Sequence, residues 1–417
     1  MTETAQALAN LDVWLETMRQ PGGYGGPVAH WWQNRFRYAG PGLDWRYEGI
    51  LTSYRTLFEK TGDLRWRQRL RCAAQDLTSG QLPDGSYRAS RFEINPGRRG
   101  TPHEAAASLG LLAALPHLEN RERAFGVAQR NLDSLIAELW DGEGFNDRPG
   151  VAGRVPNKLA TLAQALMALA DVSGEDRYLR YAQAALEDVL RYQVKGGAWR
   201  GAIHQYAPDA KQGDGRFFPF YAARCVPPLH RAYEVFADER YLNAAHETLA
   251  FIEKNRDEDG SWPQIIYKGG RRASWPRWIA GAADILLAYR VLGERIPEGA
   301  WRRLLRSQSA TGAFPTAQGF ASQISQRPPR RLPDYRDVIA VVGWNDKVFR
   351  LMCEELHSDV PSAAVSEVWQ PIMVQGREAM YEETPHRIDI VAAKRPLYRW
   401  NKQHVWAHVV HPKLDVR

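Results

Sequence analysis

The chain of 417 residues is poor in cysteine and has no long apolar run. Its three cysteines, Cys72, Cys225 and Cys353, are scattered, so neither a disulfide framework nor a paired-cysteine zinc site is expected. We expect them to be reduced, buried thiols. No stretch of about 18 apolar residues occurs, and no membrane span is therefore predicted.

A secretion signal, a nucleic-acid-binding signature and a phosphate-binding loop are also missing. The first residues, MTETAQALANLDVWLE, have neither a basic start nor an apolar run, which predicts a cytoplasmic protein. The formal charge is +7, but acidic residues are interleaved throughout, so no nucleic-acid partner is expected. The glycines of 22–26 follow a predicted helix rather than a strand, which argues against a dinucleotide cofactor. We predict no cofactor.

What the sequence does contain is an internal repeat. Three segments with similar residues, each ending in an aromatic residue, are followed 19 residues later by a glycine and two residues after that by a second aromatic. The segments are Gly62–Trp66, Gly174–Tyr178 and Ala237–Tyr241, and the glycines are Gly85, Gly197 and Gly260. Fixed offsets of this kind indicate one supersecondary unit used several times.

Glycine–aromatic signals recur six times, at Gly23, Gly85, Gly144, Gly197, Gly260 and Gly312. The spacing between them suits two helices with their connections, and six such hairpins can close a ring. Apolar periodicity predicts twelve helices, at 4–19, 44–61, 64–79, 103–115, 121–138, 157–173, 176–192, 220–236, 239–255, 277–292, 298–307 and 345–357. The fold class predicted is all-α, an (α/α)6 toroid over residues 1–360. The connections 80–101, 192–219 and 308–343 are long enough to be binding loops.

Residues 361–417 have a different pattern and predict a small C-terminal β-containing extension. Segments 387–391 and 404–409 alternate as strands do, and Lys394, Arg395 and Pro396 between them are expected to form a turn. His404 and His408 would face one side, near His386 and His411. No cysteine or acidic partner stands at ligand spacing, so no metal is predicted.

The predicted starts of the helices that follow the long connections share proline and polar residues. Proline in a first turn is a structural preference, but the His, Asn, Lys, Tyr, Arg and Asp residues beside it are not a core set. If six starts surround one cavity, they place acids, bases and six partly positive helix ends around it. Capping of helix ends explains Asp44, Asn157 or Asn345 equally well when each is taken alone.

The catalytic candidates are residues able to exchange protons. Asp44 and Glu48 stand four apart, so both carboxylates can reach one space, as acid/base cleavage of a glycosidic bond requires. Tyrosine with histidine or arginine could instead remove a proton beside a carboxylate, as a uronate lyase or epimerase requires. The full set is Asp44, Glu48, His103, Glu104, Asp147, His204 and Tyr206.

Arginine is abundant in the connecting segments, where it suits a carboxylate or phosphate. We therefore expect an anionic small molecule or glycan as the partner, although each arginine alone could be a solvated loop charge. The predicted substrate-binding residues are His30, Trp31, Arg35, Arg99, Asn157, Lys158, Arg224, Trp275, Arg277, Trp278, Asn345 and Asp346.

A Gln-x3-Gly-x-aromatic pattern appears at Gln81–Tyr87, Gln193–Trp199 and Gln308–Phe314. It resembles the repeat of the terpenoid cyclases and protein prenyltransferases, which are α/α toroids. The Gly-Asp/Glu-x-Arg-Tyr helix starts look equally like the six-hairpin glycosidases, sugar epimerases and uronate-active enzymes built on an (α/α)6 ring. Both resemblances imply the fold and transfer no function. The Asp-x-Asp-Asp and Asp-x-Cys motifs of the first family are absent.

Three functions remain open. The first is a carbohydrate-active enzyme (a hydrolase, lyase or epimerase) that works on a uronate-containing saccharide or its precursor by general acid/base chemistry. The second is an isoprenoid enzyme that binds a diphosphate. The third is a toroid that binds a glycan or peptide without turnover.

Overall fold

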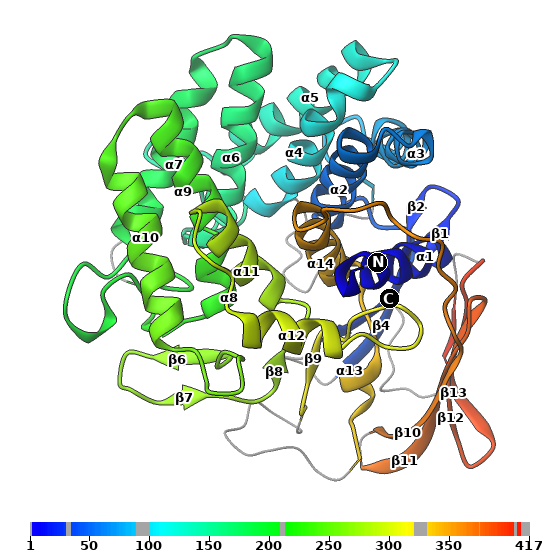
Figure 1. Ribbon diagram of the computed structural model, residues 1–417. Coiled ribbons are helices and arrows are strands. Elements are labelled where there is room, and N and C mark those ends of the chain that lie inside the picture. The colour runs from blue at the N-terminus through cyan, green and yellow to red at the C-terminus, as the bar shows by residue number, and fades with distance from the viewer. Residues whose placement is uncertain are drawn as a thin grey trace.

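A computed structural model describes residues 2–30, 35–88, 101–208, 213–320, 332–374, 376–403 and 407–409 (Figure 1). Its helices form two concentric rings. The inner ring consists of α2 (Arg46–Thr61), α4 (Ala105–Ala114), α6 (Pro156–Ser173), α8 and α9 (Pro219–Ala223 and Val226–Phe236), α11 (Ala282–Val291) and α14 (Val342–Glu354). The outer ring consists of α1 (Glu3–Thr17), α3 (Leu64–Gly80), α5 (Arg121–Leu139), α7 (Arg177–Arg191), α10 (Glu239–Lys254) and α12 (Glu298–Arg306).

The inner ring is closed. Each inner helix packs against the next in chain order, and α14 packs against α2 to complete the circle. The first helix, α1, pairs with the last inner helix, α14, so the sixth hairpin joins the two ends of the ring (Figure 1). The predicted (α/α)6 toroid is therefore confirmed, and each of the twelve predicted helices corresponds to a helical position in it.

Two inner helices differ from their predicted form. The helix predicted over 220–236 is divided into α8 and α9, because Pro227 and Pro228 lack the N–H groups that would continue its hydrogen bonding. The helix predicted to begin at residue 277 begins only at Ala282, because Arg277–Trp278 forms strand β8.

The repeated glutamines have a structural function in the outer wall. The Nε2 atom of Gln81 donates to the oxygen of Gly85, 3.1 Å away, and to that of Val127 in α5, 2.7 Å away. Gln308 does the same with Gly312 at 2.8 Å and Ala7 of α1 at 2.7 Å. Each glutamine thus closes its own glycine turn and attaches it to the next outer helix.

The glycines of these turns are required by the same arrangement. Gly312 has a φ of 88°, and a Cβ there would collide with the carbonyl of Asn10 in α1. Gly85 has a φ of 86°, and a Cβ there would lie 2.7 Å from the carbonyl oxygen of Arg130 in α5. The repeat found in the sequence is therefore a packing device between successive hairpins.

Short strands and helical turns fill the connections. Two-stranded pairs are β1 (Arg19–Gln20) with β2 (Gly23–Tyr24), β3 (Gly26–His30) with β4 (Arg35–Ala39), and β8 (Arg277–Trp278) with β9 (Ala317–Gln318). A three-stranded sheet joins β5 (Arg216–Phe217), β6 (Ile265–Tyr267) and β7 (Arg272–Ala273). Helical turns lie at η1 (Pro102–Glu104), η2 (Leu115–His117), η3 (Gly197–Trp199) and α13 (Tyr335–Val338).

The C-terminal extension is a five-stranded antiparallel sheet in chain order. Its strands are β10 (Val368–Val374), β11 (Arg377–Glu383), β12 (Arg387–Ala392), β13 (Arg395–Asn401) and β14 (Ala407–Val409). One face is apolar and buried, and Trp14 of α1 donates from Nε1 to the Glu383 carboxylate at 2.8 Å. The sheet therefore packs on the outer wall beside the chain's first helix.

Some sequence predictions need correction. Arg395 and Pro396 begin strand β13 instead of forming a turn, which is made by Ala393 and Lys394 with positive φ. Cys72 is exposed, because it lies on the outer side of α3, whereas Cys225 and Cys353 are buried. His404 and His411 lie outside the described residues. Within the described part of the chain no group of metal-ligating side chains occurs, and no helix there is long and apolar enough to cross a membrane.

Candidate active site at the axis of the toroid

The starts of the inner helices bring aromatic side chains together at one end of the ring. Trp344 in α14 lies 5.3 Å from Trp45, which precedes α2, and 4.6 Å from Trp278 in β8, between ring centroids. Phe220 in α8 stacks on Trp278 at 4.5 Å. The His103 ring in η1 stacks on Trp45 at 5.6 Å. We call these five side chains the aromatic tier.

Charged side chains lie two to six residues further along the same inner segments. Glu48 of α2 forms ion pairs with Arg224, at the α8–α9 junction, and with Arg350 of α14, the latter at 2.5 Å. Because α2 and α8–α9 stand opposite each other in the ring, the Glu48–Arg224 pair crosses its axis. Arg224 also lies 3.8 Å from Asp284 of α11.

Asp346 and Lys347 of α14 complete this group. The Lys347 Nζ atom donates to Asp346 Oδ2 at 2.7 Å and lies 4.6 Å from the centre of the Trp45 ring. Lys347 thus connects the two layers. We call Glu48, Arg224, Asp284, Asp346, Lys347 and Arg350 the ionic tier.

Burial and neighbouring charges set different protonation states within the ionic tier. Burial alone would raise the pKa of Glu48, but Arg224, Arg350 and Lys347 outweigh it and hold the pKa well below its usual range. Burial raises the pKa of Asp346 to about 7, against the opposing effect of Lys347. Glu48 is therefore a permanent anion, whereas Asp346 can hold or release a proton near neutrality.

His103 is a neutral base at the boundary between the tiers. Burial lowers its pKa well below the usual range, and Arg224, Lys347 and Lys158 lower it further, against Glu48. Three cationic neighbours therefore oppose protonation of the ring, and one anionic neighbour favours it. A partly buried, unprotonated imidazole among such neighbours can accept a proton from a bound molecule.

Several buried polar atoms around the tiers have no hydrogen-bond partner among the described residues. They are Trp45 Nε1, Asn157 Oδ1, Arg224 Nε and Asp346 Oδ1. Buried polar atoms are normally paired. Four unpaired ones from four inner segments are therefore the donors and acceptors that a polar ligand could satisfy.

Three predicted site residues are held in structural contacts. Asp44 forms a two-point ion pair with Arg46 at 2.8 and 3.1 Å. Asn345 exchanges two hydrogen bonds with the backbone of Phe314, at 2.8 and 2.9 Å. Arg277 is paired with Asp259. These residues position the helix starts, and the structure does not bring Asp44 into the ion-pair network of Glu48.

Other candidates surround the tiers. Asp147 accepts from Lys158 Nζ at 2.8 Å, and the ring of Trp275 lies 4.7 Å from the guanidinium of Arg277. The Glu104 side chain is buried beside His103 in η1.

His204 and Tyr206 lie on the connection that precedes β5. The amide of Gly215 donates to His204 Nδ1 at 2.9 Å, and the His204 ring packs on Phe217. The Tyr206 ring covers the backbone of Gly153.

Four predicted ligand-binding residues cannot be placed as side chains. Trp31 and Arg99 lie outside the described residues. His30 and Arg35 are opposite each other in the β3–β4 pair, and only their backbone is described. Their assignment stays a prediction.

Sequence reasoning missed several residues of the two tiers. Arg350 lies eight residues after the start of α14, and Asp284 lies seven residues after the helix start that was predicted at 277, so both were outside the starts that were compared. Arg350 stands three residues after Lys347, and this i+3 spacing is the signal that could have identified it. Trp45, Phe220 and Trp344 were not among the predicted site residues.

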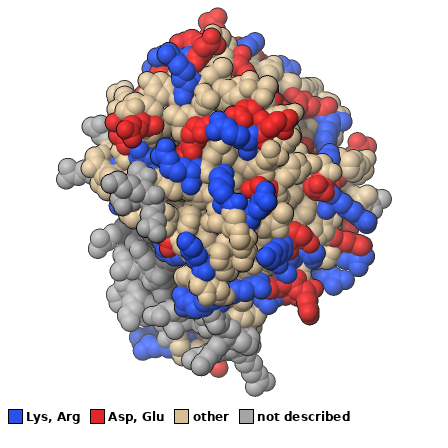
Figure 2. All heavy atoms as spheres, turned by 90° about the vertical axis from the view of Figure 1, so that its left-hand side faces the viewer, with Lys and Arg blue, Asp and Glu red and all other residues tan. Residues whose placement is uncertain are grey.

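Several arginines in the described parts of the connections are paired with acidic residues. Arg216 pairs with Asp214 at 2.7 Å, Arg272 with Asp257 at 2.9 Å and Arg336 with Asp334 at 2.6 Å. Basic and acidic side chains also alternate over the face shown in Figure 2.

Comparison with known proteins supports the fold. By sequence, neither a family model nor a curated protein matches the chain. Among solved structures, a D-mannose isomerase matches with a TM-score of 0.62 at 12% identity, covering 85% of this chain and 97% of that one. A sugar epimerase from a ruminal bacterium matches at 0.61 and 14%, covering 86% and 99%. A family 76 glycoside hydrolase (mannosidase) from Bacteroides thetaiotaomicron matches at 0.56 and 11%, covering 85% and 97%. At these identities the likeness shows a shared (α/α)6 toroid fold.

Proposed function

We propose that the protein is a carbohydrate-active enzyme that removes a proton from a uronate-containing saccharide, as a lyase or epimerase does. The observation that carries this proposal is the unprotonated His103 ring, stacked on Trp45 and surrounded by Arg224, Lys347 and Lys158. A base with cationic neighbours suits a carbon acid whose charge develops on a neighbouring carboxylate. Similar folds in a sugar epimerase and a mannose isomerase add support by analogy.

The two tiers provide complementary contacts for such a substrate. Flat aromatic side chains suit the apolar faces of sugar rings, and Trp45, Trp278 and Trp344 offer three of them. His103 would take the proton attached to the carbon beside the carboxylate, and the electron pair of that C–H bond would move into the carboxylate. Arg224 and Lys347 would stabilise the enediolate formed.

Two outcomes can follow from that intermediate. Return of a proton to the other face of the carbon gives the epimer. Expulsion of the substituent on the next carbon gives an unsaturated sugar and a released alcohol. Either outcome needs one proton, on the carbon for the epimer or on the leaving oxygen for the alcohol. Asp346, with its pKa raised to about 7, is the group in the site suited to supply it. Hydrolysis by a carboxylate pair is less well supported, because Glu48 is held by two arginines and Asp44 by Arg46.

An isoprenoid function would draw on the same aromatic tier. Its diphosphate would need free cations, yet Arg224, Arg350 and Lys347 are each paired with a carboxylate. The paired cations favour a ligand of smaller charge, such as a single carboxylate.

Proton nuclear magnetic resonance in D2O tests the proposal in one experiment. The purified protein is incubated with uronate disaccharides, neutral disaccharides and prenyl diphosphates. Deuterium incorporation at the carbon beside the carboxylate, with signals of the epimer at that carbon, indicates an epimerase, an alkene proton indicates a lyase, and a new reducing end without exchange indicates a hydrolase. Thermal melting with the same compounds reports binding separately, since a ligand at about a hundredfold excess over its Kd adds about 2.7 kcal/mol. Stabilisation by prenyl diphosphates alone would refute the saccharide proposal.

A further inference from the structure

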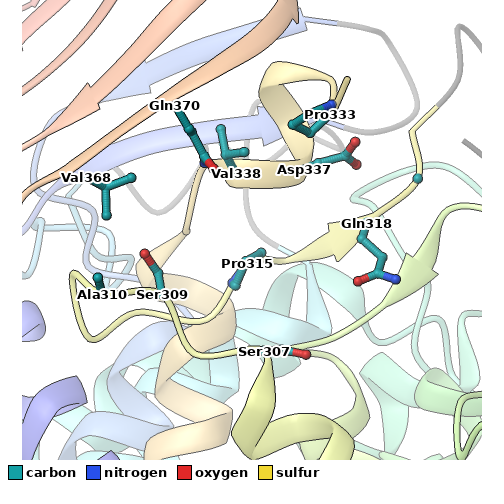
Figure 3. Close-up of a pocket in the computed structure, with 11 residues that line it drawn as sticks. Ser307, Ser309, Ala310, Pro315, Gln318, Pro333, Asp337, Val338, Val368 and Gln370 are labelled. Atoms are coloured by element: carbon teal, nitrogen blue, oxygen red, sulfur yellow. The ribbon is translucent and has the colours of Figure 1, made fainter. Parts of the chain in front are cut away.

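A cavity lies where the toroid meets the C-terminal sheet (Figure 3). Its volume is about 510 Å³, within the range of small-molecule sites. Ser309 follows α12, Gln318 ends β9, Asp337 belongs to α13 and Gln370 to β10. In Figure 3 these side chains surround the space between α13 and the chain that leads into β9. We call it the junction pocket.

The chemistry of the junction pocket differs from that of the aromatic and ionic tiers, which together we call the axial site. None of the described residues that line it is Lys or Arg. Gln318 and Gln370 can each donate and accept, and Ser309 carries a hydroxyl. Pro315, Val338 and Val368 provide apolar walls. Mixed donors and acceptors without a cation suit a neutral, polyhydroxylated group rather than an anion.

Asp337 adds a fixed acceptor. It is 8% exposed, and its two oxygens accept from the backbone N–H groups of Phe320 at 2.9 Å and Asp334 at 2.8 Å. Each oxygen has a further lone pair, so the carboxylate can still accept from a ligand hydroxyl. The two backbone bonds hold it in one orientation.

Elements that line the junction pocket pair with, or lead directly into, elements that carry the aromatic and ionic tiers. Gln318 pairs with Arg277 across the β8–β9 ladder, and Ala317 pairs with Trp278 of the aromatic tier. Neighbouring strands are about 4.8 Å apart. On the other side, α13 leads within a few residues into α14, which carries Trp344.

We infer that the junction pocket binds a neutral sugar residue attached to the unit that reacts at His103, an inference that rests on the proposed saccharide function. The substrate is then at least a disaccharide, with its acidic residue on the aromatic tier and its neutral residue against Gln318, Asp337 and Gln370. This gives the C-terminal sheet a role, because Gln370 of β10 forms part of the wall.

Calorimetric titration tests this inference with neutral disaccharides and trisaccharides and, separately, with free glucuronate. The variants are Gln318→Leu with Gln370→Leu, and Ala310→Trp, which fills the pocket from an exposed position. Gln75→Leu, on the outer surface of α3, is the matched control, and His103→Ala alters the axial site alone. Melting curves establish that each variant is folded.

We expect neutral oligosaccharides to bind about tenfold more weakly to both pocket variants, with unchanged glucuronate binding. Gln75→Leu and His103→Ala should leave the neutral ligands unaffected. If neutral oligosaccharides bind equally to the pocket variants but weakly to His103→Ala, the junction pocket is not their site and the axial function stands. If glucuronate binds and no neutral oligosaccharide does, the inference is wrong. If nothing binds, the inference and the proposed function are both wrong.

Discussion

The outer wall and the axis of the toroid use polar residues in opposite ways. In the wall, Gln81 and Gln308 make the same pair of hydrogen bonds at two hairpins. At the axis, the charged side chains differ from one inner helix to the next, and ion pairs of Glu48 and Arg224 join α2, the α8–α9 junction, α11 and α14 into one network. Residues that repeat between hairpins therefore have a structural role within each hairpin. Residues that do not repeat contribute to one site that several hairpins build together.

At the axis, the loss of His103 should have the largest effect, and that effect is on turnover. We expect His103→Ala to lower turnover of the active saccharide by a factor of about 10²–10⁴, because a positioned general base contributes that much. The free energy of unfolding should change little, since the ring is partly exposed and, among the described residues, stacks on Trp45. Rate measurements by deuterium exchange, paired with urea unfolding, check both parts.

His204→Ala is a matched control, because that ring packs on Phe217 and accepts from Gly215. It should retain turnover. If the His103→Ala protein keeps its activity, His103 has no role in the mechanism. The comparison between wall and axis then has no catalytic part.

The next largest effect is on stability. Glu48→Gln keeps the shape of the side chain but leaves Arg224 and Arg350 without their common anion. Breaking a buried pair in this way costs about 3–5 kcal/mol, so we expect a loss of that order in urea unfolding. Glu298→Gln, which removes an exposed partner of Arg302 in α12, should cost less than about 0.5 kcal/mol. Equal losses in the two variants would mean that the ionic tier is solvated.

The difference between wall and axis also explains what the sequence could reveal. The helices and the closed ring were predictable because the Gln–Gly turns and the apolar periodicity recur locally. Glu48 and His103 could be selected as polar residues at helix starts. That Glu48 faces Arg224 across the ring, 176 residues away, could not be predicted, because a pair across the axis depends on how all six hairpins close.

The roles of two further residues could not be predicted, because contacts with nearby residues determine them. Asp44 looked like a partner of Glu48, but Arg46, two residues away, competes for its carboxylate. Pro396 looked like a turn residue, but it stands opposite Val391 in the β12–β13 pair, beside an irregularity in the ladder where proline is tolerated. In both cases a short-range contact decided between two reasonable predictions.

On the wall side, Gln308→Leu tests the repeat. It removes the donor to Ala7 and Gly312 and leaves both carbonyl oxygens short of a partner. We expect a loss of about 1–3 kcal/mol in urea unfolding, with turnover unchanged at temperatures where the protein is folded. Gln75→Leu on the exposed side of α3 should change stability by no more than about 0.5 kcal/mol. Reduced turnover in a fully folded Gln308→Leu protein would show that the wall and the axis are not separable.

A pH dependence of stability is also expected from the axis. Burial raises the pKa of Asp346 to about 7 in the folded protein from 3.8, so the folded state holds this proton more tightly than the unfolded state does. Its contribution to stability is complete below about pH 4 and declines as the pH rises to about 7. The amide side chain of the Asp346→Asn variant cannot titrate, so the stability of wild type relative to the variant should fall over that interval and stay level above it.

Urea unfolding of wild type and Asp346→Asn at several pH values measures this difference. Asp12 and Asp337, whose pKa values burial raises to about 6, are present in both proteins and cancel in the comparison. Two parallel curves would mean that Asp346 is ionised throughout. If Asp346 also supplies the proton in turnover, the decline of wild-type activity above about pH 7 should be absent from the residual activity of the variant.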